Sequence, residues 1–341
     1  MASNIENEQI FQIFHPNDNT QFFELNATDL LDFVILLNDF YLSLRKQIGL
    51  KHTSTFGLEL EFENADRQKI ADQLTKCNLR ELWKMKDDAS LHDGAEINSP
   101  VLRDSEKNWK DLEQVCSIVS NYASIEKKAG GHIHVGTQVL GDSYDSWIHF
   151  IELWSIYENV LFRFFYGEYL GARPFINEYA EPISIDLWNA YQKTIHSTTD
   201  ISKILSYISP TRHQAVNFKR VLRDNYFQYE KNNTIEFRCP NGTLDPVIWQ
   251  NNVNTIMKLL YYCKSPKYDQ DKVLKRHELL DSQFYDISLY DEIYLDQVLE
   301  FVDMIFDNNQ DKIYFLKQYL KSFQVVLHHK DDLKGKTYTK K

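Results

Sequence analysis

The sequence lacks the features that mark the common metal and redox sites. It has only four cysteines, and no two of them form a CxxC pair: Cys77, Cys116, Cys239 and Cys263. This spacing is typical of reduced thiols, and it argues against both a disulfide framework and a thiolate zinc cluster. The chain also has no HExxH sequence, no dinucleotide-binding glycine fingerprint and no nucleophile elbow.

Basic charge and long apolar runs are also scarce. The formal net charge is −11, whereas domains that bind nucleic acid usually have a basic surface. This charge does not exclude a nucleotide substrate, because a bound cation could mask the phosphates. The apolar run Phe33–Leu37 is far too short to span a membrane, and residues 1–8 are polar and acidic, unlike a signal peptide. We therefore expect a cytoplasmic protein that binds neither nucleic acid nor a membrane.

Apolar and aromatic residues are abundant, with 20 Tyr and 21 Phe among 341 residues. A chain of this length and composition can bury a large core. It shows no internal repeat and no long linker. We expect a catalytic domain over residues 51–264, a helical extension over 1–50, and a C-terminal helical extension over 265–341 that ends in a disordered basic tail.

The segment Phe56–Glu63 alternates strictly between apolar and acidic residues. Its apolar residues are Leu58, Leu60 and Phe62, and its acidic residues are Glu59, Glu61 and Glu63. Successive side chains of a strand point to opposite faces, so same-face neighbours lie about 6.6 Å apart. Two of these carboxylates could therefore share one ion or two adjacent ions. Alone, the pattern is most often a strand whose acidic residues face water.

Three further predicted strands carry ionisable or amide side chains at alternating positions. These side chains are Glu96 with Asn98, His132 with His134, and Glu236 with Arg238. Taken singly, the histidines could belong to a core and Glu236 could pair with Arg238. Together with the predicted helices, the strands indicate an α+β fold with a mostly antiparallel sheet. One face would be apolar and covered by helices, and the other would be a concave active-site face.

Helical periodicity and capping residues predict the elements around this sheet. The predicted helices span residues 26–48, 64–76, 109–128, 144–166 and 246–264. The helix over 144–166 is apolar nearly all round, which indicates a central position. A further short strand is predicted within residues 82–88.

Carboxylates combined with histidine and no thiolate suit Mg²⁺ or Mn²⁺ better than Zn²⁺ or copper. So many carboxylates on one face would be costly without cations, because like charges at short range favour protonation. Two divalent ions about 3.5–4 Å apart would remove this cost and could clamp a transferring phosphoryl group. Arg238 would then suit a phosphate or a carboxylate.

The order of these motifs resembles the amidoligase family of the glutamine synthetase/glutamate–cysteine ligase superfamily of carboxylate–amine ligases. The motifs are Gly57-x-Glu59-x-Glu61, Asp88-x-Ser90, Glu96-Ile-Asn-Ser-Pro100, Gly130-Gly-His132-Ile-His134-Val-Gly136 and Thr234-Ile-Glu236-Phe-Arg238. The resemblance covers about residues 55–260. It implies a strongly bent antiparallel sheet and ATP-dependent amide formation through an acyl phosphate, with ATP and Mg²⁺ or Mn²⁺ as cofactors.

The resemblance also implies roles for individual residues. Glu61 and Glu96 would bind one cation, and the second cation would be held by Glu59, His132 and Glu236. His134 would contact the ATP phosphates, and Arg238 would hold the transferring phosphoryl group or the acceptor carboxylate. Asp88 would lie near the incoming amine. Among the other arginines we select Arg173, in an irregular turn, as a further anion contact.

Two positions depart from the family pattern and leave the acceptor pocket undefined. Ala89 stands where the family commonly has glycine, and Asn98 replaces a usual aliphatic residue. Glu63 lies beyond the matched motif, and we expect it at the rim of the site.

The partners implied are a small-molecule or peptide carboxylate and an amine, and an oligomer is compatible with the superfamily. Two other functions remain open from sequence alone. One is a metal-dependent phosphotransferase on the same fold, and the other is a non-catalytic relative that binds a nucleotide or a peptide. The complete set of five metal ligands favours an enzyme.

Overall fold

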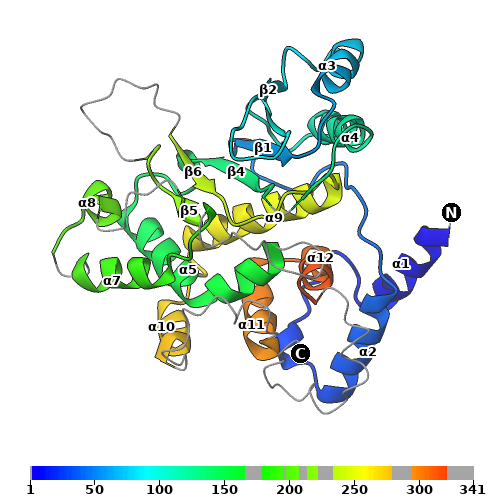
Figure 1. Ribbon diagram of the computed structural model, residues 1–341. Helices are drawn as coiled ribbons and strands as arrows, with labels where there is room; N and C mark the ends of the chain where they lie inside the picture. Colours follow the sequence, from blue (N-terminus) through cyan, green and yellow to red (C-terminus); the bar gives the residue numbers. More distant parts are fainter. Residues whose placement is uncertain are drawn as a thin grey trace. The chain divides into compact units, whose positions relative to one another are not determined.

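The computed structural model describes residues 2–126, 128–165, 179–194, 197–206, 213–221, 233–278 and 294–320 (Figure 1). The chain forms two compact units. The sheet unit comprises Leu44–Ile156 and Arg173–Leu279, and the helical unit comprises Met1–Ser43, Tyr157–Ala172 and Leu280–Lys341. The predicted basic tail at 334–341 lies outside the described residues, as does Arg173.

The sheet unit contains a six-stranded sheet in the order β2-β3-β1-β4-β6-β5. Every neighbouring pair is antiparallel. The strands are β1 (Phe56–Phe62), β2 (Lys84–Lys86), β3 (Ala95–Asn98), β4 (Gly131–Gly136), β5 (Val216–Asn217) and β6 (Thr234–Phe237). The predicted α+β class with an antiparallel sheet is confirmed. Strand β5 was not predicted, because two residues show no alternation.

One face of the sheet is apolar and packs on helices. Its buried side chains include Leu58, Leu60, Phe62, Ile97, Ile133, Val135, Ile235 and Phe237. Figure 1 shows helix α9 (Pro246–Cys263) running along this side of the strands, and helix α5 (Tyr144–Phe165) approaches them in its first half. The Trp154 and Phe237 rings lie 5.6 Å apart between α5 and β6. Each fully buried large apolar side chain stabilises this layer by about 1.5–3 kcal/mol.

Close packing of α9 on the sheet depends on a glycine. A Cβ atom at Gly131 would lie 2.7 Å from Cη2 of Trp249 and 2.9 Å from the Asn241 carbonyl oxygen. Trp249 is fully buried, and its indole N–H donates to the Thr243 carbonyl. The glycine before the two β4 histidines therefore lets α9 support the strand directly from behind.

Side-chain caps define several helix ends in the sheet unit. Helix α3 (Arg67–Lys76) begins at the Asp66 cap, and α4 (Glu106–Ser120) begins at Ser105. The predicted helix over 109–128 thus starts earlier and ends earlier, because Ser124 pairs with Glu63 as a β-bridge. The unit also contains α7 (Ser184–Thr194), α8 (Ile201–Ser206) and α10 (Gln270–Glu278).

The helical unit contains α1 (Ala2–Ile13), η1 (Phe22–Glu24), α2 (Ala27–Asn38), α11 (Leu295–Ile305), α12 (Asn309–Leu320) and the end of α5. Helix α5 departs from helical geometry at Tyr157, where the chain passes between units. An ion pair joins the fully buried Lys312 to Asp303 at 2.7 Å. None of the helices among the described residues is long and apolar enough to cross a membrane.

The predicted helix over 26–48 ends ten residues early, at Asn38. Farther along, side chains satisfy the backbone of the irregular segment. Asp104 accepts from the Ile48 and Leu50 N–H groups, and Gln250 bonds both the N–H and the carbonyl of Arg45. These long-range contacts replace the helical hydrogen bonds that the local pattern predicted.

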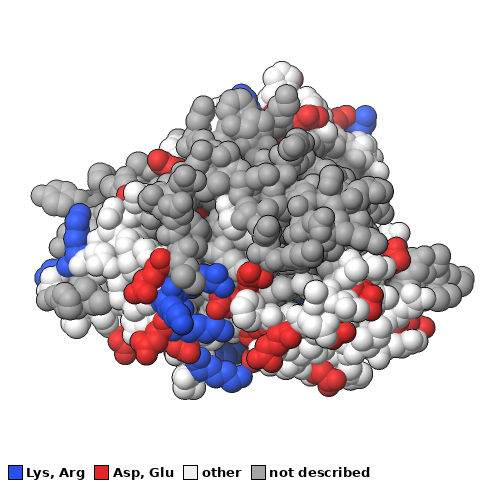
Figure 2. Space-filling model, turned by 90° about the horizontal axis from the view of Figure 1, so that it is seen from below, with Lys and Arg blue, Asp and Glu red and all other residues white. Residues whose placement is uncertain are grey.

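Acidic and basic side chains lie close together on the surface shown in Figure 2. A cluster of Lys and Arg is flanked by Asp and Glu among the residues drawn in colour. Helix α4 carries such pairs at helical spacing, Lys107 with Asp111 and Lys110 with Glu106. Opposite charges three or four residues apart on a helix attract one another, so they contribute modestly to local stability.

Candidate functional site

Strand register brings most of the predicted site residues onto one face of the sheet. Paired residues of antiparallel strands share a face. The pairs on this face are Glu59 with His132 and Asn98, Glu61 with Glu96, and His134 with Glu236. These side chains come from four adjacent strands, and the face opposite carries the apolar core. The alternation along each strand thus places the polar side chains on one face and the apolar side chains that pack on the helices on the other.

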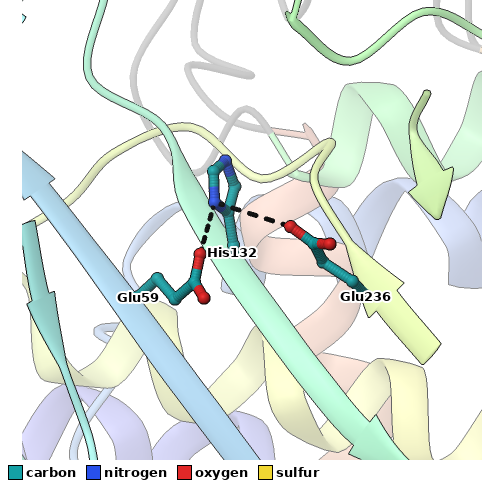
Figure 3. Close-up of side chains that lie close together, drawn as sticks. All are labelled: Glu59, His132 and Glu236. Atoms are coloured by element: carbon teal, nitrogen blue, oxygen red, sulfur yellow. Dashed lines mark hydrogen bonds and ion pairs between the residues drawn. The ribbon is translucent and has the colours of Figure 1, made fainter. Parts of the chain in front are cut away.

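The first group of candidate ligands consists of Glu59, His132 and Glu236, from β1, β4 and β6 (Figure 3). Their ligand atoms lie within 4.8 Å of one another. His132 Nδ1 is 2.9 Å from Glu59 Oε2 and 3.9 Å from Glu236 Oε1. Figure 3 shows both carboxylates directed toward the imidazole edge. The group therefore converges on a small volume above three neighbouring strands.

The second group consists of Glu61, Glu96 and His132, with the same 4.8 Å limit between ligand atoms. His132 Nε2 lies 3.4 Å from Glu61 Oε1. The other Glu61 oxygen, Oε2, accepts the Gly130 N–H at 2.6 Å. Glu96 Oε1 accepts from the Asn98 side-chain amide at 2.6 Å. Each carboxylate therefore has one oxygen held by the protein and one oxygen outside these two hydrogen bonds.

His132 belongs to both groups through its two ring nitrogens. A neutral imidazole offers a lone pair on only one nitrogen, and the other nitrogen carries a proton. His132 can therefore ligate a cation in one group, while its second nitrogen serves as a donor toward the other group. If both groups hold cations, one of them needs a ligand besides the two carboxylates.

The charges within the first group are coupled. Burial alone would raise the pKa of Glu59, but hydrogen bonds from His132 and His134 outweigh it and hold that pKa well below its ordinary value. Burial would also raise the pKa of Glu236, yet the neighbouring His132, His134 and Arg238 lower it. Both carboxylates are therefore anionic in the folded protein.

His132 itself becomes a stronger base in this environment. Burial lowers the pKa of His132, but the charges of Glu61 and Glu59 outweigh burial and an opposing contribution from Arg238, so the pKa is raised. Without a metal, a proton on His132 partly balances the carboxylates. A cation binding to this imidazole would have to displace that proton, which makes binding pH-dependent.

Glu96 shows the opposite effect to Glu59. Its pKa is raised by burial and then by the nearby Glu59 charge, although the hydrogen bond from Asn98 works against this. A carboxyl that resists ionisation beside two other carboxylates indicates a site with excess negative charge. Oxygen and imidazole nitrogen ligands suit Mg²⁺ or Mn²⁺. The side chains present therefore fit one or two divalent cations.

Arg238 and Asn217 fix the carboxylate of Glu236. Arg238 donates to Glu236 Oε1 at 2.6 Å and to the Tyr179 carbonyl at 3.2 Å. Asn217 donates to Glu236 Oε2 at 2.8 Å and is itself buried. The sequence predicted Arg238 but not Asn217. Asn217 lies in the two-residue strand β5, and only its register opposite Glu236 identifies it.

His134 closes one side of the first group. Its Nε2 lies 2.9 Å from Glu59 Oε1, and its Nδ1 lies 3.4 Å from the Thr234 hydroxyl. Glu59 therefore connects both histidines of β4 through its two oxygens. Glu59 thus has hydrogen-bond partners on both sides of the first group.

Asp88 lies just after β2, where its side chain organises a turn. It accepts from the Ser90 N–H at 2.8 Å and from the Ser90 hydroxyl at 2.6 Å. Within the described ranges, these are its side-chain hydrogen bonds, so Asp88 is not joined to the two ligand groups. The Asp-x-Ser spacing therefore corresponds to an Asx turn beside the sheet.

Glu63, which we expected at the rim, is buried with 3% of its surface exposed. Its two oxygens accept from the His92 and Lys128 backbone N–H groups at 3.1 and 3.2 Å. It connects two loops beyond the end of β1. This burial was not predicted, because alternation alone does not show that the strand pairing changes after Phe62.

Two lysines of the edge strand β2 share the face of the ligand groups. Lys84 lies opposite Asn98, and Lys86 lies opposite Glu96. Both side chains are exposed. The sequence argument used β1, β3, β4 and β6, which have no lysine at their alternating positions. The two lysines at this edge of the polar face were therefore not predicted.

Comparison with known proteins agrees with the geometry. Residues 77–260, more than half of the chain, match the family described as "Putative amidoligase enzyme". The matched range includes β3, β4 and β6, while Glu59 and Glu61 on β1 precede it. Curated proteins gave no match. The polar sheet face and the extent of the family match lead to one conclusion: the chain belongs to the amidoligase family.

Proposed function

We propose that this protein is an ATP-dependent carboxylate–amine ligase of the glutamine synthetase/glutamate–cysteine ligase superfamily. It would form an amide or isopeptide bond through an acyl phosphate. The observation that carries this proposal is the pair of ligand groups that share His132 on one sheet face. Together with the family match, this pair favours a two-cation phosphoryl-transfer site.

Each predicted ligand has a place in this scheme. Glu59, His132 and Glu236 would hold one cation, and Glu61 with Glu96 would hold the other. Bound there, the cations would neutralise the ATP phosphates as charge shifts during transfer. The carboxylates would hold the cations in place. Without the cations, so many negative side chains would repel the negatively charged phosphates of ATP.

The remaining polar residues position the substrates. His134, next to Glu59, would contact the ATP phosphates. Arg238 is held by Glu236 and by the Tyr179 carbonyl, which would fix its guanidinium for contact with the transferring phosphoryl group or the acceptor carboxylate. Asp88 and Arg173 remain candidates for contact with the amine and an anion, respectively. Positioning of this kind supplies most of the catalysis in phosphoryl transfer.

The proposed reaction has two steps. A carboxylate oxygen of the substrate attacks the γ-phosphorus, and the bond from that phosphorus to the ADP oxygen breaks. The amine nitrogen then attacks the acyl carbon of the acyl phosphate, phosphate leaves, and the amine loses a proton. A site that excludes water protects the acyl phosphate from hydrolysis between the steps.

A hydroxylamine trap tests the proposal. The full-length protein is incubated with ATP, Mg²⁺ or Mn²⁺, hydroxylamine and a panel of amino acids and peptides as carboxylates. We expect an acyl hydroxamate that depends on both ATP and the cation. Glu236→Gln should abolish it, whereas Glu113→Gln, on the exposed surface of α4, should not. Phosphate transfer to an acceptor without hydroxamate would favour a phosphotransferase, and ATP binding without turnover would favour a non-catalytic relative.

A further inference from the structure

We propose that the side-chain oxygen of Asn98 is a neutral ligand of the cation held by Glu61 and Glu96. This inference rests on the two-cation site of the proposed function and assigns that site a third protein ligand beside the two carboxylates.

Strand register places Asn98 on the same sheet face as the ligand groups. It lies on β3 two residues after Glu96, so the two side chains share the polar face. Its partner across the strands is Glu59. Directly opposed side chains in an antiparallel pair have Cβ atoms about 4.5–5.5 Å apart. Asn98 therefore stands between the carboxylates of β1 and the edge strand.

The two ends of the Asn98 amide have different environments. Nδ2 donates to Glu96 Oε1 at 2.6 Å. Oδ1 is buried and has no hydrogen-bond partner in the described part of the chain. An unsatisfied buried acceptor costs about 1–3 kcal/mol. Reversing the amide would place two oxygens 2.6 Å apart, which an ionised Glu96 does not tolerate. The oxygen therefore keeps its unpaired position whenever Glu96 is charged.

The second ligand group needs such an oxygen. If His132 binds the cation beside Glu59 and Glu236, the second cation has only Glu61 and Glu96. One oxygen of each is already held, by the Gly130 N–H and by Asn98 Nδ2. Mg²⁺ and Mn²⁺ bind about six ligands, and asparagine carbonyls are suitable oxygen donors for hard cations. Asn98 Oδ1 supplies a third protein ligand without adding charge.

A purely structural role for Asn98 is the main rival. In that case the amide would only support Glu96 through its N–H, and the oxygen would serve no purpose. The two roles respond differently to aspartate. Asn98→Asp keeps an oxygen at the same distance from the backbone but replaces the N–H donor with a second oxygen. Asn98→Leu removes both.

The test measures Mn²⁺ binding to the full-length protein by calorimetry, with no nucleotide or substrate, at neutral pH. We expect Asn98→Leu to weaken one site by roughly 10–100-fold, the range found when a partner in a metal site is removed. Asn98→Asp should stay within about threefold of the unmodified protein or bind more tightly, because a carboxylate oxygen replaces the amide oxygen. Asn121→Leu, the same change on exposed residue 121, should have no effect.

Three outcomes would overturn the assignment or its premise. Unchanged affinity in Asn98→Leu would show that the oxygen is not a ligand. A tenfold loss in Asn98→Asp would show that the N–H to Glu96 is what matters, and this variant decides the question even if Asn98→Leu does not fold. No Mn²⁺ binding by the unmodified protein would reject the two-cation site itself. That result differs from loss of the Asn98 ligand alone, in which both cations still bind.

Discussion

Replacing Glu96 with glutamine should have opposite effects on stability with and without cations. Ligand oxygens of Glu61 and Glu96 lie within 4.8 Å of each other. Two unit charges at that distance repel by about 3.5 kcal/mol at an effective dielectric constant of about 20. Glu96 avoids part of this cost by taking up a proton, since its pKa is raised by burial and by Glu59. We therefore expect Glu96→Gln to stabilise the metal-free protein by about 1–2 kcal/mol near pH 8.

With cations the order should reverse. A ligand that binds only the folded protein stabilises it by about 2.7 kcal/mol at 100 times its dissociation constant. Glu96→Gln removes a charged ligand from the cation site of Glu61 and Glu96. The variant should therefore lose most of the stabilisation that cation binding at this site provides.

Urea unfolding in a chelator and in Mn²⁺ measures both effects, with Glu113→Gln on the exposed surface of α4 as the control. We expect Glu96→Gln to have a higher free energy of unfolding than the unmodified protein in the chelator, and a lower one in Mn²⁺. A variant that is less stable in both would show that Glu96 has a structural role and would refute the reasoning.

Three further substitutions probe the support of the site and the rest of the sheet unit. Gly131→Ala should destabilise by roughly 1–3 kcal/mol, because the new methyl group collides with Trp249; an unchanged urea midpoint would contradict this. Burial raises the pKa of Glu152, so the folded protein holds this proton more tightly than the unfolded chain, and the stability this provides is lost as pH rises through the raised pKa. Glu152→Gln should therefore reduce the fall in melting temperature as pH rises through that range. Parallel plots of melting temperature against pH for the variant and the unmodified protein would show that Glu152 does not cause this pH dependence. Asn217→Ala should weaken Mn²⁺ binding roughly 10–100-fold by releasing Glu236, and normal affinity would show that Asn217 does not orient it.

The alternation of residues predicted the polar face well because it reflects a direct geometric rule. Side chains two residues apart share a face, so β1 and β4 could each be divided into a core side and a site side. The structure then supplied what alternation cannot, namely register. Register decides that Glu61 lies opposite Glu96 and that Glu59 lies opposite His132. Strands far apart in sequence find this register through packing of their apolar faces.

The features that were missed depend on contacts between distant parts of the chain. Glu63 looked like its neighbours in β1, but its carboxylate is buried and accepts from two loop N–H groups. Asn217 carries no local signal, since only its position opposite Glu236 gives it a role. The segment after Asn38 has helical periodicity, yet the chain there is irregular and Asp104 satisfies part of its backbone. Local propensity is overridden wherever such side-chain contacts are available.

The central claim is that this sheet face binds two divalent cations beneath a nucleotide. Crystals soaked with Mn²⁺ and a non-hydrolysable ATP analogue test it most directly, because anomalous scattering locates manganese independently of the rest of the structure. We expect two peaks, one among Glu59, His132 and Glu236 and one beside Glu61 and Glu96, with the analogue's phosphates next to both. Water or a lysine ammonium between these carboxylates, with no anomalous peak, would contradict the claim.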